Sequence, residues 1–180
     1  MDFVRGFSKV DSCPECGGTA VVTFSGGAGI VTSDLLSNCG VAPAELSPET
    51  MDALKKVFPP WMAPAHPVDL WPAVELNGMD VVYPASVEAL MRDDGVDSII
   101  VETVGWEAST PDYLAAIAAL KKKYRKPVAL WMVGNSNIHD VFRKTAEDGG
   151  IPVFTEIRRC VDFIAGVKRH FRKKRALLPV

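Results

Sequence analysis

The chain has 180 residues, of which 48% are hydrophobic and 23% charged, and its 20 basic and 22 acidic side chains leave a net charge of −2. This length and composition predict one globular domain with its own core. The balanced charge argues against a general nucleic-acid binder, and the lack of a long apolar run argues against a membrane span. Because residues 1–9 do not have the layout of a signal peptide, we expect a cytoplasmic protein.

Predicted strands and helices alternate along the sequence. Short apolar runs rich in β-branched residues predict strands, and these lie at 19–24, 41–46, 97–102, 127–133 and 151–154. Apolar residues at helical spacing predict helices, and these lie at 30–39, 48–58, 79–93, 110–124 and 138–148, with a long last helix capped by Thr155. The proline-rich stretch 59–71 predicts an irregular loop, and a loop of this length within a domain is usually functional or mobile.

This alternation is typical of parallel βαβ units with right-handed crossovers. Five strands in this rhythm predict an α/β fold of three layers, flavodoxin-like and therefore Rossmann-like, with a five-stranded parallel sheet in the order 2-1-3-4-5. We expect residues 19–175 to form this domain, residues 1–18 to form an irregular N-terminal segment, and residues 176–180 to form a tail.

A run of small residues follows the first predicted strand, and it consists of Ser25, Gly26, Gly27, Ala28 and Gly29. In an open parallel sheet of this order, ligands bind between the first and third strands, where this run lies. Small residues let backbone N–H groups approach a ligand, and the N-terminus of the following helix favours an anion. The run therefore predicts a phosphate site with five N–H donors, to which the hydroxyls of Ser25 and Thr32 would add. The alternative is a tight turn without a ligand, because neither the Walker nor the dinucleotide-binding spacing is present.

The proline-rich loop carries His66 and Asp69, and we expect it to overhang the strand ends. Both side chains are therefore candidate contacts for the phosphate. The alternative is a loop packed by its prolines and tryptophans, with Asp69 capping a turn. Trp61, Trp71 and Trp106 either cover an apolar groove or an interface, or they are ordinary packing residues.

Two further groups of charged residues are expected at the surface. Glu102 and Glu107 flank the end of the third predicted strand, next to the predicted phosphate site. Contact with that site is the alternative, but we expect both to be exposed because a carboxylate repels an anion. The basic residues at 168–175 predict a solvated end of the last helix, where cations are favoured by the helix dipole. Docking of this basic end to RNA or to an acidic partner is the alternative.

The cysteines do not form a disulfide framework or a complete metal site. Cys13 and Cys16 have C-x-x-C spacing, but a structural zinc needs four ligands and no second pair is present. We expect a simple turn here and no metal. The alternatives are a zinc site within one chain, a metal shared between two chains, and a redox pair. Cys39 and Cys160 fall in apolar helical patterns and are expected to be buried and inert.

Several motifs occur in an order typical of one enzyme family. They are Ser25-Gly26-Gly27-Ala28-Gly29 with Asp34, then residues 44–50 (AELSPET), Leu54 with Pro59-Pro60, His66-Pro67-Val68-Asp69-Leu70, Gly95-Val96-Asp97, Lys126-Pro127-Val128 and residues 150–154 (GIPVF). Over about residues 19–172, the chain resembles the C-terminal, succinyl-CoA-synthetase-type ligase domain of ADP-forming (NDP-forming) acyl-CoA synthetases, such as acetyl-CoA synthetases. Two positions depart from the family pattern: Ala28 stands where proline is common, and His66 stands where asparagine is usual.

The resemblance implies a ligase that interconverts an acyl-CoA, ADP and phosphate with the free acid, CoA and ATP. A phosphoryl group would pass through an acyl phosphate and a phosphohistidine, at which the helix behind Gly26 to Gly29 would point. No catalytic residue is expected in this chain, because none of His66, His139 and His170 lies in a phosphohistidine-like segment. The catalytic histidine would lie on another domain.

The resemblance also implies partners. The partners would be the family's CoA-binding and ATP-grasp modules, present as other domains or as other subunits of the same enzyme. An oligomer is also possible. No cofactor is expected to be bound tightly; ATP or ADP, CoA and phosphate are the family's substrates, with Mg²⁺ on the ATP-grasp module.

Three origins remain open for the chain: a piece of a longer enzyme, a subunit of a split enzyme, or a domain that lost its partners. The alternative function is a non-catalytic regulatory or interaction module derived from the family. An FMN-binding flavodoxin is disfavoured, because a flavin would need a longer first loop rich in hydroxyl groups.

Overall fold

The computed structural model describes residues 6–14, 17–105, 109–134 and 136–177. Its strands form one sheet in the order β2-β1-β3-β4-β5, and every neighbouring pair is parallel. The strands are β1 (Gly18–Thr23), β2 (Val68–Asp69), β3 (Val96–Gly105), β4 (Val128–Gly134) and β5 (Val153–Phe154). The predicted α/β class and strand order are confirmed.

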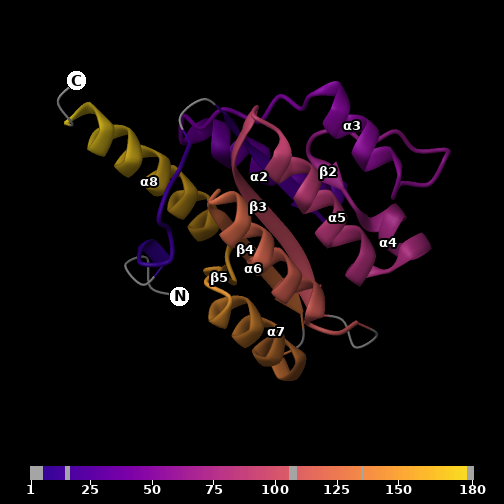
Figure 1. The fold of residues 1–180 in the computed structure, drawn as a ribbon. Helices are drawn as coiled ribbons and strands as arrows, with labels where there is room; N and C mark the ends of the chain where they lie inside the picture. Colours follow the sequence, from indigo (N-terminus) through magenta and orange to yellow (C-terminus); the bar gives the residue numbers. More distant parts are fainter. Residues whose placement is uncertain (1–5, 15–16, 106–108, 135, 178–180) are drawn as a thin grey trace.

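Helices cover both faces of this sheet (Figure 1). They are α2 (Gly26–Asn38), α3 (Pro48–Lys55), α4 (Trp71–Asn77), α5 (Met79–Arg92), α6 (Asp112–Tyr124), α7 (Ser136–Asp148) and α8 (Ile157–Ala176). One hydrophobic core lies under α2 and α8, and a larger one lies under α3 to α7. The molecule therefore has the three layers that the sequence predicts.

Strand side chains alternate between the two cores. Val21, Ile100 and Ala129 face α2 and α8, whereas their strand neighbours, such as Val22 and Val101, face the other layer. Both faces are buried, which explains why these strands appear in the sequence as continuous apolar runs.

The predicted second strand is wrong. Residues 41–46 contribute only an isolated bridge between Thr19 and Pro43, and the second strand lies at Val68–Asp69, inside the stretch predicted to be an irregular loop. The real strand has two residues, paired to Val22 and Thr23 of β1. Its nearby prolines hide it from a pattern analysis, whereas burial of Val68 holds it against the sheet.

Helix boundaries also differ from the predicted ones. Helix α2 begins at Gly26 rather than at Ile30, so the small residues form its first turn. Helix α4 was not predicted, and it is separated from α5 by Gly78, whose φ of 80° favours glycine. Glu156 rather than Thr155 holds the N-cap position of the last helix, and its side chain makes no capping hydrogen bond.

The parallel arrangement places the ends of β1 and β2 at the same edge of the sheet. Ser25 follows β1 and Asp69 ends β2, so the two segments that carry the predicted phosphate contacts lie side by side. Within the described part of the chain, none of the helices combines the length and apolar character needed to cross a bilayer.

Candidate functional site

The N-terminus of α2 presents free backbone donors at this edge of the sheet. The first amides of a helix have no partner within it, and those of Gly26, Gly27 and Ala28 have no hydrogen bond to any other described residue. Gly26 and Gly27 are exposed to solvent, and no acidic side chain lies in the first turn to offset the helix dipole. These three N–H groups can therefore receive an anion.

Two of the five predicted donors are engaged within the protein. The N–H of Ser25 donates to Thr23 Oγ1 at 3.0 Å, and the Thr23 hydroxyl in turn donates to the Ser25 carbonyl at 2.8 Å. The N–H of Gly29 donates to the same carbonyl at 3.0 Å. This small network fixes the direction in which the chain enters α2 and narrows the free donor set to three amides.

The three glycines differ in their surroundings. A Cβ atom at Gly29 would lie 2.9 Å from Pro67 Cβ and 3.0 Å from Thr23 Cγ2, so this glycine lets α2 pack tightly against the segment before β2. At Gly27, the nearest atom to an added Cβ would be Ser25 Oγ, at 3.9 Å. Packing therefore explains Gly29 but not Gly27, whose missing side chain leaves space beside the free amides.

Asp69 lies beside these amides. Its Oδ1 accepts a hydrogen bond from the N–H of Trp71 at 3.1 Å. Its Oδ2 lies close to Gly26: a Cβ atom added to this glycine would be 3.1 Å from that oxygen. The site thus combines free N–H donors, which can receive an anion, with one carboxylate, which can accept a hydrogen bond from the group that carries the anion.

His66 serves the backbone of the sheet. Its Nε2 accepts a hydrogen bond from the N–H of Val21 in β1, at 3.0 Å. Burial lowers the pKa of His66, so the ring is neutral and its proton lies on Nδ1. The accepting nitrogen is already used, which leaves only Nδ1–H for a ligand.

The expectations for Thr32 and Glu102 are wrong. Both side chains are fully buried, and the Thr32 hydroxyl donates to Glu102 Oε1 instead of facing a phosphate. The signal for Glu102 is present in the sequence, because it lies two residues after Ile100 and therefore points to the same face, under α2. Burial raises the pKa of Glu102. Glu107 lies outside the described residues.

The tryptophans have different environments. Trp61 is 77% exposed, whereas Trp71 is half-buried and its Nε1 donates to Glu75 at 3.0 Å. Trp106 lies outside the described residues. Ile30 and Val31 of α2 are 61% and 51% exposed, which puts apolar surface next to the free amides.

Three of the four cysteines, Cys13, Cys39 and Cys160, lie within the described residues, and all three are free thiols. Cys13 is 4% exposed, and burial raises the pKa of its thiol to about 11. Cys16 lies outside the described residues, and no cluster of three His, Cys, Asp or Glu residues occurs in the part that the structure covers. Cys160 is buried as predicted, but Cys39 is only half-buried.

The basic end of the last helix is only partly solvated. Lys168 is 12% exposed and forms an ion pair with the buried Asp97 at 2.6 Å. The guanidinium of Arg175 donates to the carbonyl of Cys13 at 2.6 Å. Two of the basic residues at 168–175 therefore have structural partners, while Arg172, Lys173 and Lys174 are exposed.

Comparison with known proteins identifies relatives for almost the whole chain. Acetate–CoA ligase (ADP-forming) II of Archaeoglobus fulgidus is 29% identical over 174 residues, which cover 97% of this chain and 26% of the relative. The α subunit of the corresponding ligase II of Pyrococcus furiosus is 30% identical over 160 residues, which cover 86% of this chain and 33% of the subunit. This chain is a homologue of ADP-forming acetyl-CoA synthetases. The resemblance seen in the sequence motifs is confirmed.

The homology concerns only a part of each synthetase, because the chain spans between a quarter and a third of these relatives. A solved structure supports the fold: a dinucleotide-forming acetyl-CoA synthetase of Ca. Korarchaeum cryptofilum, in complex with phosphate and ADP, aligns with a TM-score of 0.76 at 22% identity. The alignment covers 99% of this chain and 39% of that synthetase chain. No family model matches the chain.

Proposed function

We propose that the chain is the phosphate-stabilising domain of an ADP-forming acyl-CoA synthetase. The complete enzyme would convert an acyl-CoA, ADP and phosphate into the carboxylic acid, CoA and ATP. The observation that carries this proposal is the row of free amides at Gly26, Gly27 and Ala28 in a chain homologous to such synthetases. Its partners would be the CoA-binding and ATP-grasp domains or subunits.

The chemistry assigned to this chain is electrostatic. A phosphoryl group moves from an acyl phosphate to an imidazole nitrogen of a partner domain and then to a terminal oxygen of ADP. N–H groups fixed at a helix end stabilise its charge without having to reorient during transfer. The open space at Gly27 gives the phosphoryl oxygens room to approach these donors.

Asp69 would orient the histidine that carries the phosphoryl group. Its Oδ2 can accept a hydrogen bond from the N–H of the second ring nitrogen of an imidazole that approaches Gly26. Its negative charge also weakens anion binding by the amides, which suits a group that must leave again.

The substitution Gly27→Val tests this function in the complete enzyme, reconstituted with its partner domains. The new side chain would occupy the space beside the amides, and we expect phosphoryl transfer to fall at least about 100-fold, the usual loss when a preorganised donor is removed. The measurements are the rate of ATP formation and thermal unfolding followed by circular dichroism.

Ser37→Val is the matched control, because it places the same β-branched side chain on an exposed position near the other end of α2. It should keep full activity with a similar change in stability. Full turnover by a folded Gly27→Val enzyme would refute the phosphate site. If the gene and its neighbours encoded neither an ATP-grasp module nor a histidine-bearing domain, the non-catalytic module would be favoured.

A further inference from the structure

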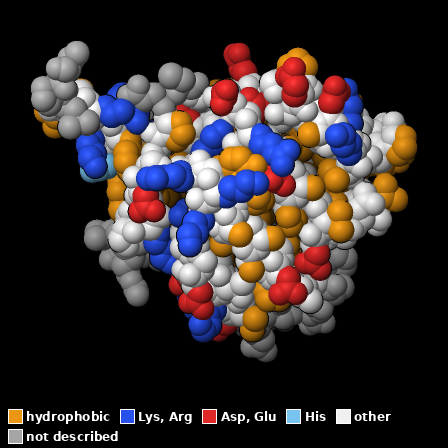
Figure 2. All heavy atoms as spheres, in the orientation of Figure 1, with side chains coloured by type: hydrophobic (Ala, Val, Ile, Leu, Met, Phe, Trp, Pro, Cys, Tyr) orange, Lys and Arg blue, Asp and Glu red, His pale blue; other side chains and the backbone are white. Residues whose placement is uncertain are grey.

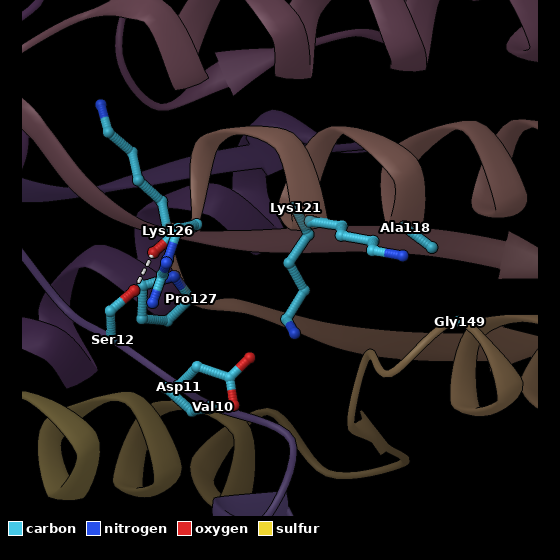
Figure 3. Close-up of a pocket in the computed structure, with 10 residues that line it drawn as sticks. Val10, Asp11, Ser12, Ala118, Lys121, Lys126, Pro127 and Gly149 are labelled. Carbon is cyan, nitrogen blue, oxygen red and sulfur yellow. Dashed lines mark hydrogen bonds between the residues drawn. The ribbon is translucent and has the colours of Figure 1, made fainter.

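A cavity of about 470 Å³ lies far from the N-terminus of α2. Its walls come from residues 10–12, the C-terminal end of α6 and the segment that leads into β4 (Figure 3). Lys126 and Pro127 line it directly before β4 begins at Val128, so it lies at the N-terminal edge of the parallel sheet. The free amides of α2 follow the C-terminal end of β1, at the opposite edge.

The lining of this cavity carries an excess of positive charge. Lys121, Lys122 and Arg125 face one acidic residue, Asp11. In the described parts of the chain, none of these four side chains forms an ion pair within 4.0 Å. Figure 2 shows Lys and Arg side chains gathered on this face over α6. Lys126 also lines the cavity, but its Nζ donates to the Asp93 carbonyl at 2.6 Å.

Lys121 is the least solvated of the three cations. Its side chain runs from α6 toward the N-terminal segment (Figure 3), where Nζ donates to the Lys9 carbonyl at 2.7 Å. Burial lowers the pKa of Lys121, and Asp11 opposes this effect only in part. A half-buried ammonium group that lacks a carboxylate partner is stabilised by an anion that enters the cavity.

Arg125 occupies a position at which glycine is usual. It ends α6 in the left-handed conformation, with φ of 57°, where a Cβ atom is unfavourable. Its carbonyl accepts a hydrogen bond from the Ser12 hydroxyl at 2.5 Å, which holds the N-terminal segment over the cavity. A guanidinium group at this place adds two parallel donors suited to phosphate oxygens.

We propose that this cavity is a second anion site, which binds the diphosphate group of a small molecule. Three cations against one carboxylate match a ligand with two or more negative charges. The other lining residues are small or aliphatic, including Val10, Ala118 and Pro127, and no aromatic side chain is among them. The site therefore recognises phosphates rather than a nucleotide base, and it does not depend on the function proposed for α2.

Titration of the ¹⁵N-labelled chain with inorganic pyrophosphate tests the proposal. The amide resonances of Ser12, Ala118 and Gly149 should shift, with half-saturation below about 1 mM. The double variant Arg125→Gly/Lys122→Ser should weaken this binding at least about tenfold, because two charge-assisted contacts are lost. Glycine suits the backbone at position 125 and Lys122 is exposed, so the variant should fold.

The variant Arg172→Gln/Lys173→Ser removes two exposed charges from α8 and should bind pyrophosphate like the wild type. A parallel titration with ADP identifies which kind of molecule carries the diphosphate group. If ADP shifts the same resonances and binds more tightly than pyrophosphate, the ligand is a phosphate ester. If the two bind equally, the ligand is free diphosphate. Shifts confined to Gly26, Gly27 and Ala28 would overturn the proposal. Equal pyrophosphate affinity of the Arg125→Gly/Lys122→Ser variant and the wild type would overturn it as well.

Discussion

The carboxyl group of Glu102 lies inside the protein beneath the second turn of α2. Its side chain is fully buried, Oε1 accepts a hydrogen bond from Thr32, and Oε2 has no partner among the described residues. Burial raises the pKa of Glu102 because the charged form cannot be solvated there. The raised pKa favours the neutral form of this carboxyl group, which links β3 to the helix that presents the candidate phosphate site.

Replacement of Glu102 by glutamine should make the protein less sensitive to pH. The raised pKa means that the native state keeps a proton which the unfolded chain releases, so wild-type stability falls as pH rises from about 4.3 through the native pKa. Glutamine does not ionise, and the stability of Glu102→Gln relative to wild type should rise by up to about 1.4 kcal/mol per pH unit in that range. Urea unfolding between pH 4 and 8 measures this difference.

The exposed Glu45→Gln is the control for this experiment, because it removes a carboxyl group that water already solvates. A stability difference between Glu102→Gln and wild type that did not change with pH would contradict a raised pKa of Glu102.

At the scale of single elements, α2 and α3 begin in different ways. Ser47 caps α3, and its Oγ accepts a hydrogen bond from the N–H of Thr50 at 3.2 Å. Ser25 holds the same position before α2, but its side chain makes no capping hydrogen bond. At the start of α3, a serine side chain accepts a hydrogen bond from a backbone amide of the first turn. At the start of α2, the first amides have no such acceptor, so they are free to donate to a ligand.

Alanine substitutions at the two caps should show this contrast. We expect Ser47→Ala to lower the free energy of unfolding by about 1 kcal/mol, the typical value of a lost N-cap, because the Thr50 amide loses its acceptor. Ser25→Ala should cost less than about 0.5 kcal/mol, since no such bond is broken. Chemical denaturation of the two variants makes the comparison, and equal losses would show that Ser25 also caps its helix.

At the scale of the whole molecule, a buried ion pair joins distant parts of the chain. Nζ of Lys168 in α8 lies 2.6 Å from Asp97 Oδ2 in β3 and also donates to the carbonyl of Gly17 at 3.2 Å. Asp97 accepts a further hydrogen bond from Ser98 Oγ at 2.7 Å. The pair thus connects the last helix, the central strand and the segment that leads into β1.

Lys168→Met should destabilise the protein by about 3 kcal/mol, because it leaves the Asp97 carboxylate buried without its countercharge. Thermal and chemical unfolding give the value. Lys173→Met, on an exposed turn of the same helix, removes a lysine without a buried partner and should change stability by less than about 0.5 kcal/mol. If both substitutions cost the same, the ion pair would have no special role.

Prediction from sequence succeeds here where local and tertiary requirements agree. Strands β1, β3 and β4 are buried on both faces, so their apolar runs are visible in the sequence. Helix α3 starts where predicted, with Ser47 at the N-cap position and Pro48 as the first helical residue. It fails at β2, since two residues between prolines carry no pattern and pair with β1 only because the fold brings them there. It also fails at Thr32, whose hydroxyl turns inward to Glu102.

The amino-acid sequence by itself determined the α/β class and the run of small residues at the start of α2, because these depend on side-chain pattern and on backbone requirements that are local. The alternation of strands and helices also predicted the strand order, but the segment that forms the second strand was not identified. Only the tertiary structure decided which amides in that run stay free, that Asp69 lies beside them, and that Lys121, Arg125 and Asp11 share one cavity. Each of these depends on segments that are distant in sequence, and their distances are set by how the helices and loops pack on the sheet.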